Sequence, residues 1–336
     1  MQTTDAQLVW NRLNGIICIY KPPMIPWMKT RSNLLTKLST ELNEMQCRPQ
    51  RPHVNIVGDT SQKLNVEVNP SYADHPLAIG PRYIPQEMKA LFVRPLGSLM
   101  SGVCVVGINK GVGTAFYLKK INPVSTFRIT GQLGISTDDK TAYGKILFRC
   151  QSKHIQRINV DKVVAMIEAT RRKSIFALTG VHPQSQAAYE MLAQGLSRPV
   201  ETKYPVLYSV KCIDLNAPDF TLEVVTANEH YHYLLDLVSE MGFRLRNAAI
   251  TTSIQCIRCC YFSLEDALLK KHWTLQNVID NMSRCDKILR SNKQFGEFLH
   301  RMEKEEMTGV VAHEKDTLEE YEAGEYEEEA KMKKKM

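Results

Sequence analysis

Residues 92–107, FVRPLGSLMSGVCVVG, join a short loop to an uncharged apolar run. The run at 103–106 predicts a strand in the middle of a sheet, because a strand that is buried on both faces shows no polar alternation. The loop before it contains Arg94, Pro95 and Gly97. A loop that leads into a core strand is a common position for a catalytic side chain. This loop nevertheless contains no acid, histidine or cysteine.

Strand and helix patterns follow one another irregularly along the chain. Alternating or uniformly apolar stretches predict strands. They lie at residues 15–20, 101–108, 127–134, 144–150 and 220–225. Apolar residues at helical spacing predict helices. They lie at residues 160–171, 186–194 and 229–241, with shorter helices expected from about 114 and at 267–271. An irregular order of strands and helices favours an α+β fold over a doubly wound sheet.

A single large domain is predicted for residues 1–290, because the apolar pattern continues to about Asn292 and then fades. Within this domain, residues 30–75 are weakly patterned, and the run RPQRPHVN predicts an irregular insertion. Residues 291–336 predict a charged tail that is disordered or forms a loose helix, since they include EEYEAGEYEEEAKMKKKM.

The distribution of charge points to a polyanionic partner. Residues 301–336 contain 12 acidic and 7 basic residues, a net charge of −5. The whole chain carries +7, so residues 1–300 carry +12. A folded region with this excess of cations suits a nucleic acid. The alternative is a basic protein that has no such partner.

Targeting signals are weak in this sequence. No apolar run approaches the roughly 18 residues that a membrane span needs, and the N-terminus lacks the apolar region of a secretory signal. It is also a poor mitochondrial presequence, with Asp5 and a single base, Arg12. The nine scattered cysteines therefore predict reduced thiols in an intracellular compartment.

Two short motifs carry little chemistry. Cys256 and Cys259 form a CxxC, but the chain has no second CxxC and no His-x3–5-His pair to complete a zinc site. Strand or turn cysteines are the better interpretation, and no metal is predicted. The glycines at 107–113 match neither a Walker A loop nor a dinucleotide fingerprint, so a turn before a helix explains them.

Several segments, in order, resemble the TruB-type pseudouridine synthases. Residues 15–22, GIICIYKP, resemble the opening strand of that family, and residues 99–107, LMSGVCVVG, resemble the strand after its catalytic loop. Further similar segments are LGISTDD and AYG within 127–144, YEMLAQG at 189–195, EMG at 240–242, and IR with FSLED within 257–266. The forms YKPP, HPL and QAAYEM resemble the mitochondrial animal branch. The similarity covers residues 12–270.

This resemblance implies the pseudouridine synthase fold, a central mixed, mostly antiparallel sheet with a basic cleft, flanked by helices. It also implies an isomerisation within RNA, in which the N1–C1′ bond of uridine breaks and a C5–C1′ bond forms without a cofactor or a metal. The uridine is flipped out, because its reacting atoms are inaccessible in a stacked helix. The family's essential group is one aspartate positioned by an arginine, and a tyrosine stacks on the flipped base.

Transferred residue by residue, the resemblance places a glycine where the family has its aspartate. Alignment on the SGV at 101–103 puts Gly97 at the aspartate position and keeps the preceding leucine as Leu96. The position of the supporting arginine reads Leu235. The two losses fit each other, because an arginine left opposite a missing aspartate would be an uncompensated buried charge.

The positions expected to bind the substrate are Lys21, Phe127, Tyr233 and Arg258. Phe127 stands at the position of the stacking tyrosine, so it keeps an aromatic ring and lacks the hydroxyl group.

Three acids are candidates to replace the aspartate. Glu87 is the one carboxylate between residues 75 and 137, and Asp138 and Asp139 follow closely. Turn structure is the better interpretation of Asp138 and Asp139, since STDDK is a turn composition. A substitute acid would have to come within hydrogen-bonding distance of the reacting atoms.

Two functions of different classes follow. The first is pseudouridine synthesis in tRNA or mitochondrial mRNA, impaired by the change at Gly97. The second is non-catalytic: binding of tRNA or of mitochondrial mRNA or rRNA, or assembly with proteins of a mitochondrial RNA granule. The resemblance implies a mitochondrial location and no cofactor for either function.

Overall fold

The computed structural model describes residues 5–46, 51–58, 65–121, 124–179, 184–186, 189–190, 205–292 and 295. The chain divides into two compact units, Met1–Asp286 and Lys287–Met336. Of the second unit, the described residues are 287–292 and 295. The helix expected at 186–194 and the tail expected at 291–336 therefore lie largely outside the described residues.

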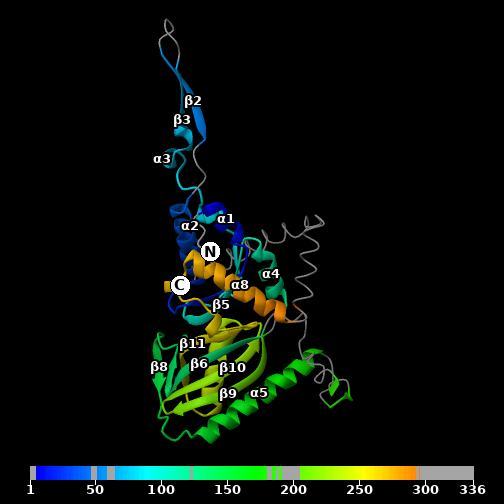
Figure 1. Cartoon of the computed structure of the whole chain (residues 1–336). Helices are drawn as coiled ribbons and strands as arrows, with labels where there is room; N and C mark the ends of the chain where they lie inside the picture. Colours follow the sequence, from blue (N-terminus) through cyan, green and yellow to red (C-terminus); the bar gives the residue numbers. More distant parts are fainter. Residues whose placement is uncertain are drawn as a thin grey trace. The chain divides into compact units, whose positions relative to one another are not determined.

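An eight-stranded mixed sheet forms the centre of the first unit (Figure 1). Its main path runs β1-β5-β11-β6-β10-β9, while β4 pairs with β5 and β12 with β11. The strands are β1 (Gly15–Lys21), β4 (Ala90–Phe92), β5 (Met100–Ile108), β6 (Ser125–Leu133), β9 (Val206–Asn216), β10 (Asp219–Ala227), β11 (Ala249–Cys259) and β12 (Phe262–Ser263). In this sheet β5 and β11 are parallel and the other pairs are antiparallel. The expected α+β class with a central mixed, mostly antiparallel sheet is confirmed.

The central strand β5 is buried along all of its 9 residues, as its uncharged sequence predicted. Gly102 within it has φ +119°, and an added Cβ would lie 2.1 Å from the carbonyl oxygen of Cys256. A glycine is therefore required for β11 to approach β5 this closely. As a result, β11 lies between β5 and β6, although it comes far later in the sequence.

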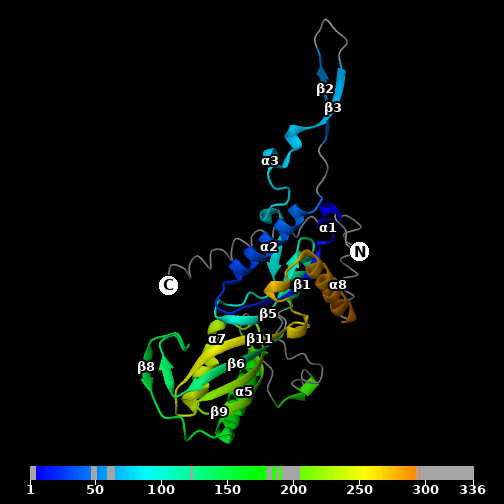
Figure 2. The same cartoon turned by 60° about the vertical axis from the view of Figure 1, so that its left-hand side comes forward.

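Helices cover the sheet (Figures 1 and 2). Helix α4 (Gly111–Lys120) packs on β5 and β1, α5 (Arg157–Thr179) packs on β9, and α7 (Tyr231–Arg244) packs on β11 and α5. An added Cβ at Gly111 would lie 2.1 Å from the carbonyl oxygen of Gly15. The glycine-rich turn before α4 therefore serves close packing. The remaining longer helices are α1 (Ala6–Arg12), α2 (Trp27–Glu44) and α8 (Leu275–Ser291).

The irregular insertion expected at 30–75 is wrong for its first part, because residues up to Glu44 belong to helix α2. This helix has 18 residues, and its buried side chains are spaced to lie on one side of it. The buried leucines are Leu34, Leu35, Leu38 and Leu42. Leu34, Leu38 and Leu42 recur at helical spacing, so the period was present in the sequence, and the expectation rested on the run RPQRPHVN further along the chain.

A hairpin follows in the same region, where β2 (Pro52–Val57) and β3 (Asn65–Pro70) form a two-stranded sheet of their own. Directly opposed residues share one face of a hairpin. Val54 lies opposite Val68, and Ile56 lies opposite Val66. All four of these side chains are exposed, and Ile56 is 67% exposed. This apolar face of the hairpin is therefore open to solvent. The second two-stranded sheet, β7 (Ile135–Thr137) with β8 (Ile146–Arg149), confirms the strand expected within 144–150.

The short helix expected at 267–271 is wrong. The chain forms two 3₁₀ turns instead, η3 (Leu264–Asp266) and η4 (Lys270–His272). Ser263 and Asp266 form a capping box, but the helix does not continue past it. Between the turns, the Leu268 N–H donates to the Cys18 carbonyl, and the Leu268 carbonyl accepts from the Tyr20 N–H. These bonds to β1 hold Leu268 in an extended conformation.

Within the described part of the chain, no helix combines the length and the hydropathy that a membrane crossing needs. The same residues contain no group of three or more His, Cys, Asp or Glu side chains that could hold a metal ion. Cys256 and Cys259 are free and buried on β11, so they are strand cysteines.

Candidate functional site: the Gly97 loop and the start of α7

Gly97 lies in the loop between β4 and β5, where the Met100 N–H donates to the Gly97 carbonyl at 3.1 Å. We call residues 93–99 the Gly97 loop. A Cβ added at position 97 would lie 3.6 Å from ring carbons of Tyr231 and 3.7 Å from Sδ of Met100, both ordinary contact distances. A side chain at position 97 would therefore face the first residue of α7.

Lys21, the last residue of β1, binds the C-terminal end of this loop. Its side chain is fully buried, and Nζ donates to the carbonyls of Met100 at 2.7 Å and of Ser98 and Pro22 at 3.3 Å. Burial lowers the pKa of Lys21 to about 8. Lys21 was expected to bind the substrate; in this structure its ammonium group is used by the backbone of the loop.

Tyr231 is the aromatic residue beside Gly97, and the sequence had not singled it out. Its ring is partly buried, and burial raises the pKa of its hydroxyl to about 12, with a smaller contribution from Asp139. The hydroxyl is therefore a neutral donor at physiological pH. A signal was present in the sequence, since Tyr231 opens the helix that follows strand β10.

A buried ion pair joins the Gly97 loop to the residues just before α7. Arg94 Nη1 contacts Glu229 Oε2, and their side chains are 14% and 3% exposed. Burial raises the pKa of Glu229 to about 7, although Arg94 beside it opposes this shift. Sequence reasoning missed this pair, because Glu229 is far from Arg94 along the chain.

Two of the three acids considered as substitutes for the aspartate have other partners. Asp138 Oδ1 accepts from the N–H groups of Asp139 and Lys145, both at 2.8 Å. Asp139 accepts from the N–H of Thr141 at 2.8 Å and from its hydroxyl at 2.7 Å. These two aspartates therefore have the turn role that was the preferred interpretation. Glu87 is exposed at the end of the 3₁₀ turn η2 (Pro85–Glu87).

Phe127 and Arg258 lie on neighbouring strands of the sheet. Phe127 on β6 is fully buried, so its ring presents no free face to a base in this conformation. This burial speaks against the expected stacking role. Arg258 on β11 is exposed, so its guanidinium is available to a phosphate.

Tyr233 and Leu235 lie further along α7. Tyr233 is two residues from Tyr231 and so faces another side of the helix. Its ring lies under the guanidinium of Arg171 from α5, with 5.8 Å between the Arg171 carbon Cζ and the ring centroid. Leu235 is buried on the core side of α7. Neither residue is brought to Gly97 by a recorded contact.

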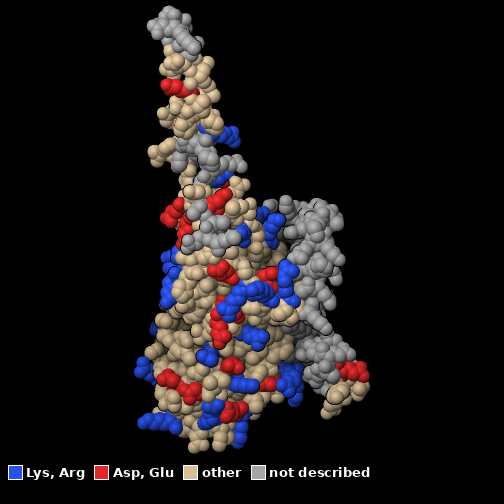
Figure 3. All heavy atoms as spheres, in the orientation of Figure 1, with Lys and Arg blue, Asp and Glu red and all other residues tan. Residues whose placement is uncertain are grey.

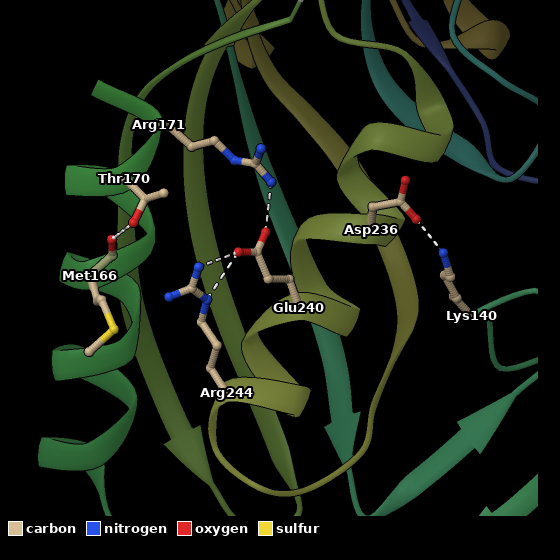
Figure 4. Close-up of polar contacts among 7 residues, drawn as sticks. All are labelled: Lys140, Met166, Thr170, Arg171, Asp236, Glu240 and Arg244. Carbon is tan, nitrogen blue, oxygen red and sulfur yellow. Dashed lines mark hydrogen bonds and ion pairs between the residues drawn. The ribbon is translucent and has the colours of Figure 1, made fainter. Parts of the chain in front are cut away.

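Acidic side chains of α7 form ion pairs, and one of these pairs joins α7 to α5 (Figure 4). Glu240 accepts from Arg171 Nη2 at 2.7 Å and from Arg244 Nε at 3.0 Å. Asp236 lies one turn earlier in the helix, and its side chain points away from α5 and pairs with Lys140. The helix that presents Tyr231 is therefore held by polar contacts along its length as well as by its buried face.

Charge on the surface is mixed. On the face drawn in Figure 3, blue and red side chains are interspersed with uncharged surface. The described residues on that face form no broad patch of one sign. The basic cleft that the resemblance implies stays a prediction.

Known proteins resemble this chain in sequence. The profile of the TruB family pseudouridylate synthase (N terminal domain) matches residues 84–232. That match includes the Gly97 loop and the first residues of α7. Pseudouridylate synthase TRUB2, mitochondrial, of Xenopus tropicalis is 29% identical over 284 residues, which cover 82% of this chain and 87% of the relative. The human protein of that name is 28% identical over 277 residues, covering 80% and 83%. The chain is thus similar to TruB family proteins over most of its length.

A bacterial protein and a solved archaeal structure show weaker similarity to this chain. The tRNA pseudouridine synthase B of Syntrophomonas wolfei is 26% identical over 213 residues, covering 61% of this chain and 67% of the relative. A chain in the crystal structure of the archaeal box H/ACA sRNP Nop10-Cbf5 complex aligns with a TM-score of 0.42 and 11% identity. That alignment covers 81% of this chain and 55% of the archaeal chain. The sequence matches alone bear out the family resemblance drawn from residues 15–22 and 99–107.

Proposed function

We propose that this TruB family member binds a uridine-containing RNA at the Gly97 loop and does not isomerise the uridine. The observation that carries the proposal is Gly97 itself, which stands where the family resemblance puts its aspartate. Glycine has no side chain to act as a nucleophile or a base. Tyr231 beside it offers a ring for stacking, and base–aromatic stacking is a common element of RNA recognition.

The neighbouring acids support a non-catalytic role. Glu229 is the buried carboxylate two residues before Tyr231, and it is paired with Arg94. Asp139 is occupied by the turn at Thr141. A substitute acid would have to leave these contacts to reach the sugar or base of a bound uridine.

The RNA class and the compartment are proposed from the relatives. The curated relatives named above are described as mitochondrial, and the bacterial relative is named for tRNA. We therefore place this chain in mitochondria, with tRNA or mitochondrial mRNA or rRNA as its ligand. The +12 charge of residues 1–300 supports a polyanionic ligand.

A pseudouridine assay tests the proposal. Purified protein is incubated with uridine-labelled tRNA and mitochondrial transcripts beside an active TruB synthase, and RNA binding is measured in parallel. The proposal expects salt-sensitive binding and no product above background. Product above background would refute it, and variants of Glu87, Asp138, Asp139 and Glu229 would then identify the acid.

Restoration of the lost pair gives a second test. Position 97 has ordinary contact distances around an added Cβ, so a side chain can begin there without a clash. Gly97→Asp alone is expected to give no product, because Leu235 offers no charge to orient the carboxylate. Gly97→Asp with Leu235→Arg is expected to form more pseudouridine than either single variant. A double variant that binds RNA but forms none would contradict the assignment of Leu235.

A second candidate function is assembly with proteins of a mitochondrial RNA granule. The exposed apolar face of the β2–β3 hairpin favours it, because exposed apolar patches mark interaction sites. A contact through this face should weaken little with salt, whereas RNA binding should weaken steeply. Replacement of Ile56 and Val66 by threonine would separate the two functions.

A further inference from the structure

Two segments meet at Gly97, and each carries one partner of a buried ion pair. Arg94 lies three residues before Gly97, and Glu229 lies two residues before Tyr231. The contact at position 97 joins the same two segments, since an added Cβ there would meet the Tyr231 ring. The ion pair and the Gly97–Tyr231 approach therefore connect the loop and the start of α7 at neighbouring points.

We propose that the Arg94–Glu229 pair is a positioning clamp that holds the Gly97 loop on the start of α7 and so keeps a nucleoside-binding surface formed between Gly97 and Tyr231. The inference rests on the proposed RNA-binding function of this site. Neither Gly97 nor Leu235 carries a charge that could join the two segments. Arg94 and Glu229 do carry such charges, at the right place and with little access to water.

The loop is held at both ends. Arg94 fastens its beginning to Glu229, and Lys21 fastens its end through the carbonyls of Ser98 and Met100. Leu96, between these anchors, is buried. Gly97 therefore lies in a segment that is tied at its beginning through its own Arg94 to Glu229 and at its end by Lys21 of β1.

The energetics favour a positional role over a purely stabilising one. A buried ion pair gains little net stability, because desolvation of both charges offsets their attraction. Burial raises the pKa of Glu229 to about 7 despite Arg94, which is a direct sign of this cost. The other titratable groups beside the pair are the thiols of Cys256, Cys259 and Cys260 on and beside β11, none of which is a cation. Arg94 is therefore the cationic partner that can hold Glu229 in its charged form.

Charge reversal tests the clamp. Arg94→Glu and Glu229→Arg each place like charges together, whereas the double variant restores an opposite pair. Hydrogen exchange of the amides at 93–99 is measured without RNA, and the Kd for tRNA is measured separately. We expect each single variant to speed exchange and weaken RNA binding by at least about tenfold, because a buried charge loses its partner. We expect the double variant to recover most of both effects.

Arg171→Glu is the matched control. Arg171 also forms an ion pair with α7, through Glu240, but it does so on the α5 side of the helix. This variant should leave exchange at 93–99 unchanged. If a reversal variant does not fold, Arg94→Met and Glu229→Gln remove one charge without adding repulsion and take its place.

The two measurements, hydrogen exchange at 93–99 and the Kd for tRNA, test the clamp and the proposed function separately. Unchanged exchange at 93–99 in the single variants, or equal acceleration by Arg171→Glu, would overturn the clamp whatever the RNA data show. Faster exchange with no change in Kd would overturn the part of the inference that ties the clamp to RNA binding. A wild-type protein that binds no RNA would refute the proposed function, and the exchange data would still decide whether the clamp exists.

Discussion

The charged side chain of Lys21 donates hydrogen bonds to backbone carbonyl groups. Its ammonium group has no recorded carboxylate partner among the described residues, and it donates to three carbonyl groups instead. Two of these carbonyls, at Ser98 and Met100, belong to the segment that leads from Gly97 into β5. A lysine in this position fixes where the loop ends, so it acts on the site without facing it.

Lys21→Met tests this role. The methionine keeps an apolar stem but leaves the buried Met100 carbonyl without its lysine donor. We expect a loss of about 1–3 kcal/mol in the free energy of unfolding, measured by urea titration, because an unsatisfied buried acceptor costs that much. Lys153→Met, at an exposed lysine, is the control and should change stability by less than about 0.5 kcal/mol. Equal effects of the two variants would contradict the pinning role.

The pKa of Glu229 predicts a pH dependence of stability. Its folded value of about 7 lies above the roughly 4.3 of an unfolded glutamate. The folded protein therefore binds this proton more tightly, so the contribution is full below about pH 4 and is lost as pH rises through 7. Its upper bound is about 3–4 kcal/mol. Wild type should lose stability relative to Glu229→Gln between pH 5 and 8 in urea titrations. Parallel curves for the two proteins would contradict the shifted pKa.

At the residue scale, the sequence predicted where the Gly97 loop lies better than it predicted which side chains contact one another. The Gly97 loop was located because an uncharged strand follows it directly. Tyr231, Arg94 and Glu229 were missed as a group, since their proximity depends on how α7 packs against β11. The orientation of Tyr233 toward Arg171 was equally hidden, because α5 and α7 are far apart in the chain.

At the element scale, α2 and the β2–β3 hairpin are neighbours in sequence with opposite burial. The leucines of α2 are buried, whereas the hairpin leaves its valines and Ile56 in solvent. An isolated two-stranded hairpin is at best marginally stable in water. We therefore expect the helix to contribute to the folding cooperativity of the domain and the hairpin to contribute little.

Two alanine substitutions compare these elements. Leu38→Ala removes a fully buried side chain and should cost about 2–5 kcal/mol of unfolding free energy. Ile56→Ala removes an exposed side chain and should cost less than about 0.5 kcal/mol. Chemical denaturation followed by circular dichroism measures both. A similar cost for both would mean that the hairpin face is covered in solution.

Elements were predictable where local pattern and tertiary contacts agree. The strands β1, β5 and β10 and the helix α7 have clear periodicity and were found. The turns at η3 and η4 were taken for a helix because bonds between Leu268 and β1 cannot be read from local sequence. Helix α2 was missed although Leu34, Leu38 and Leu42 recur at helical spacing, because the irregular run RPQRPHVN was extended over it.

At the scale of the whole molecule, charge is divided unevenly along the chain. Residues 301–336 carry −5 and the rest carry +12. We expect an acidic segment on the same chain to lower the affinity for RNA by competing for cationic residues, and we expect salt to screen this effect. The charge of the whole chain thus understates the attraction that its first 300 residues offer to a polyanion.

Deletion of residues 301–336 tests this competition. The truncated protein should bind tRNA several-fold more tightly than the full chain at about 50 mM salt, and the difference should vanish near 0.5 M. Fluorescence anisotropy across a salt series measures both proteins. Replacement of the tail by an uncharged segment of equal length controls for chain length. Identical affinities at low salt would show that the tail does not compete.

The parallel pairing of β5 with β11 has a consequence for synthesis on the ribosome. Strands β5 and β6 are close in the sequence, yet β11 must enter between them. Until residue 259 has left the exit tunnel, the nascent chain holds two partial sheets with open edges. Such edges invite pairing with other chains. Translation that stops short of β11 should therefore yield an aggregating product that depends on chaperones, even though every residue of the Gly97 loop has already been made.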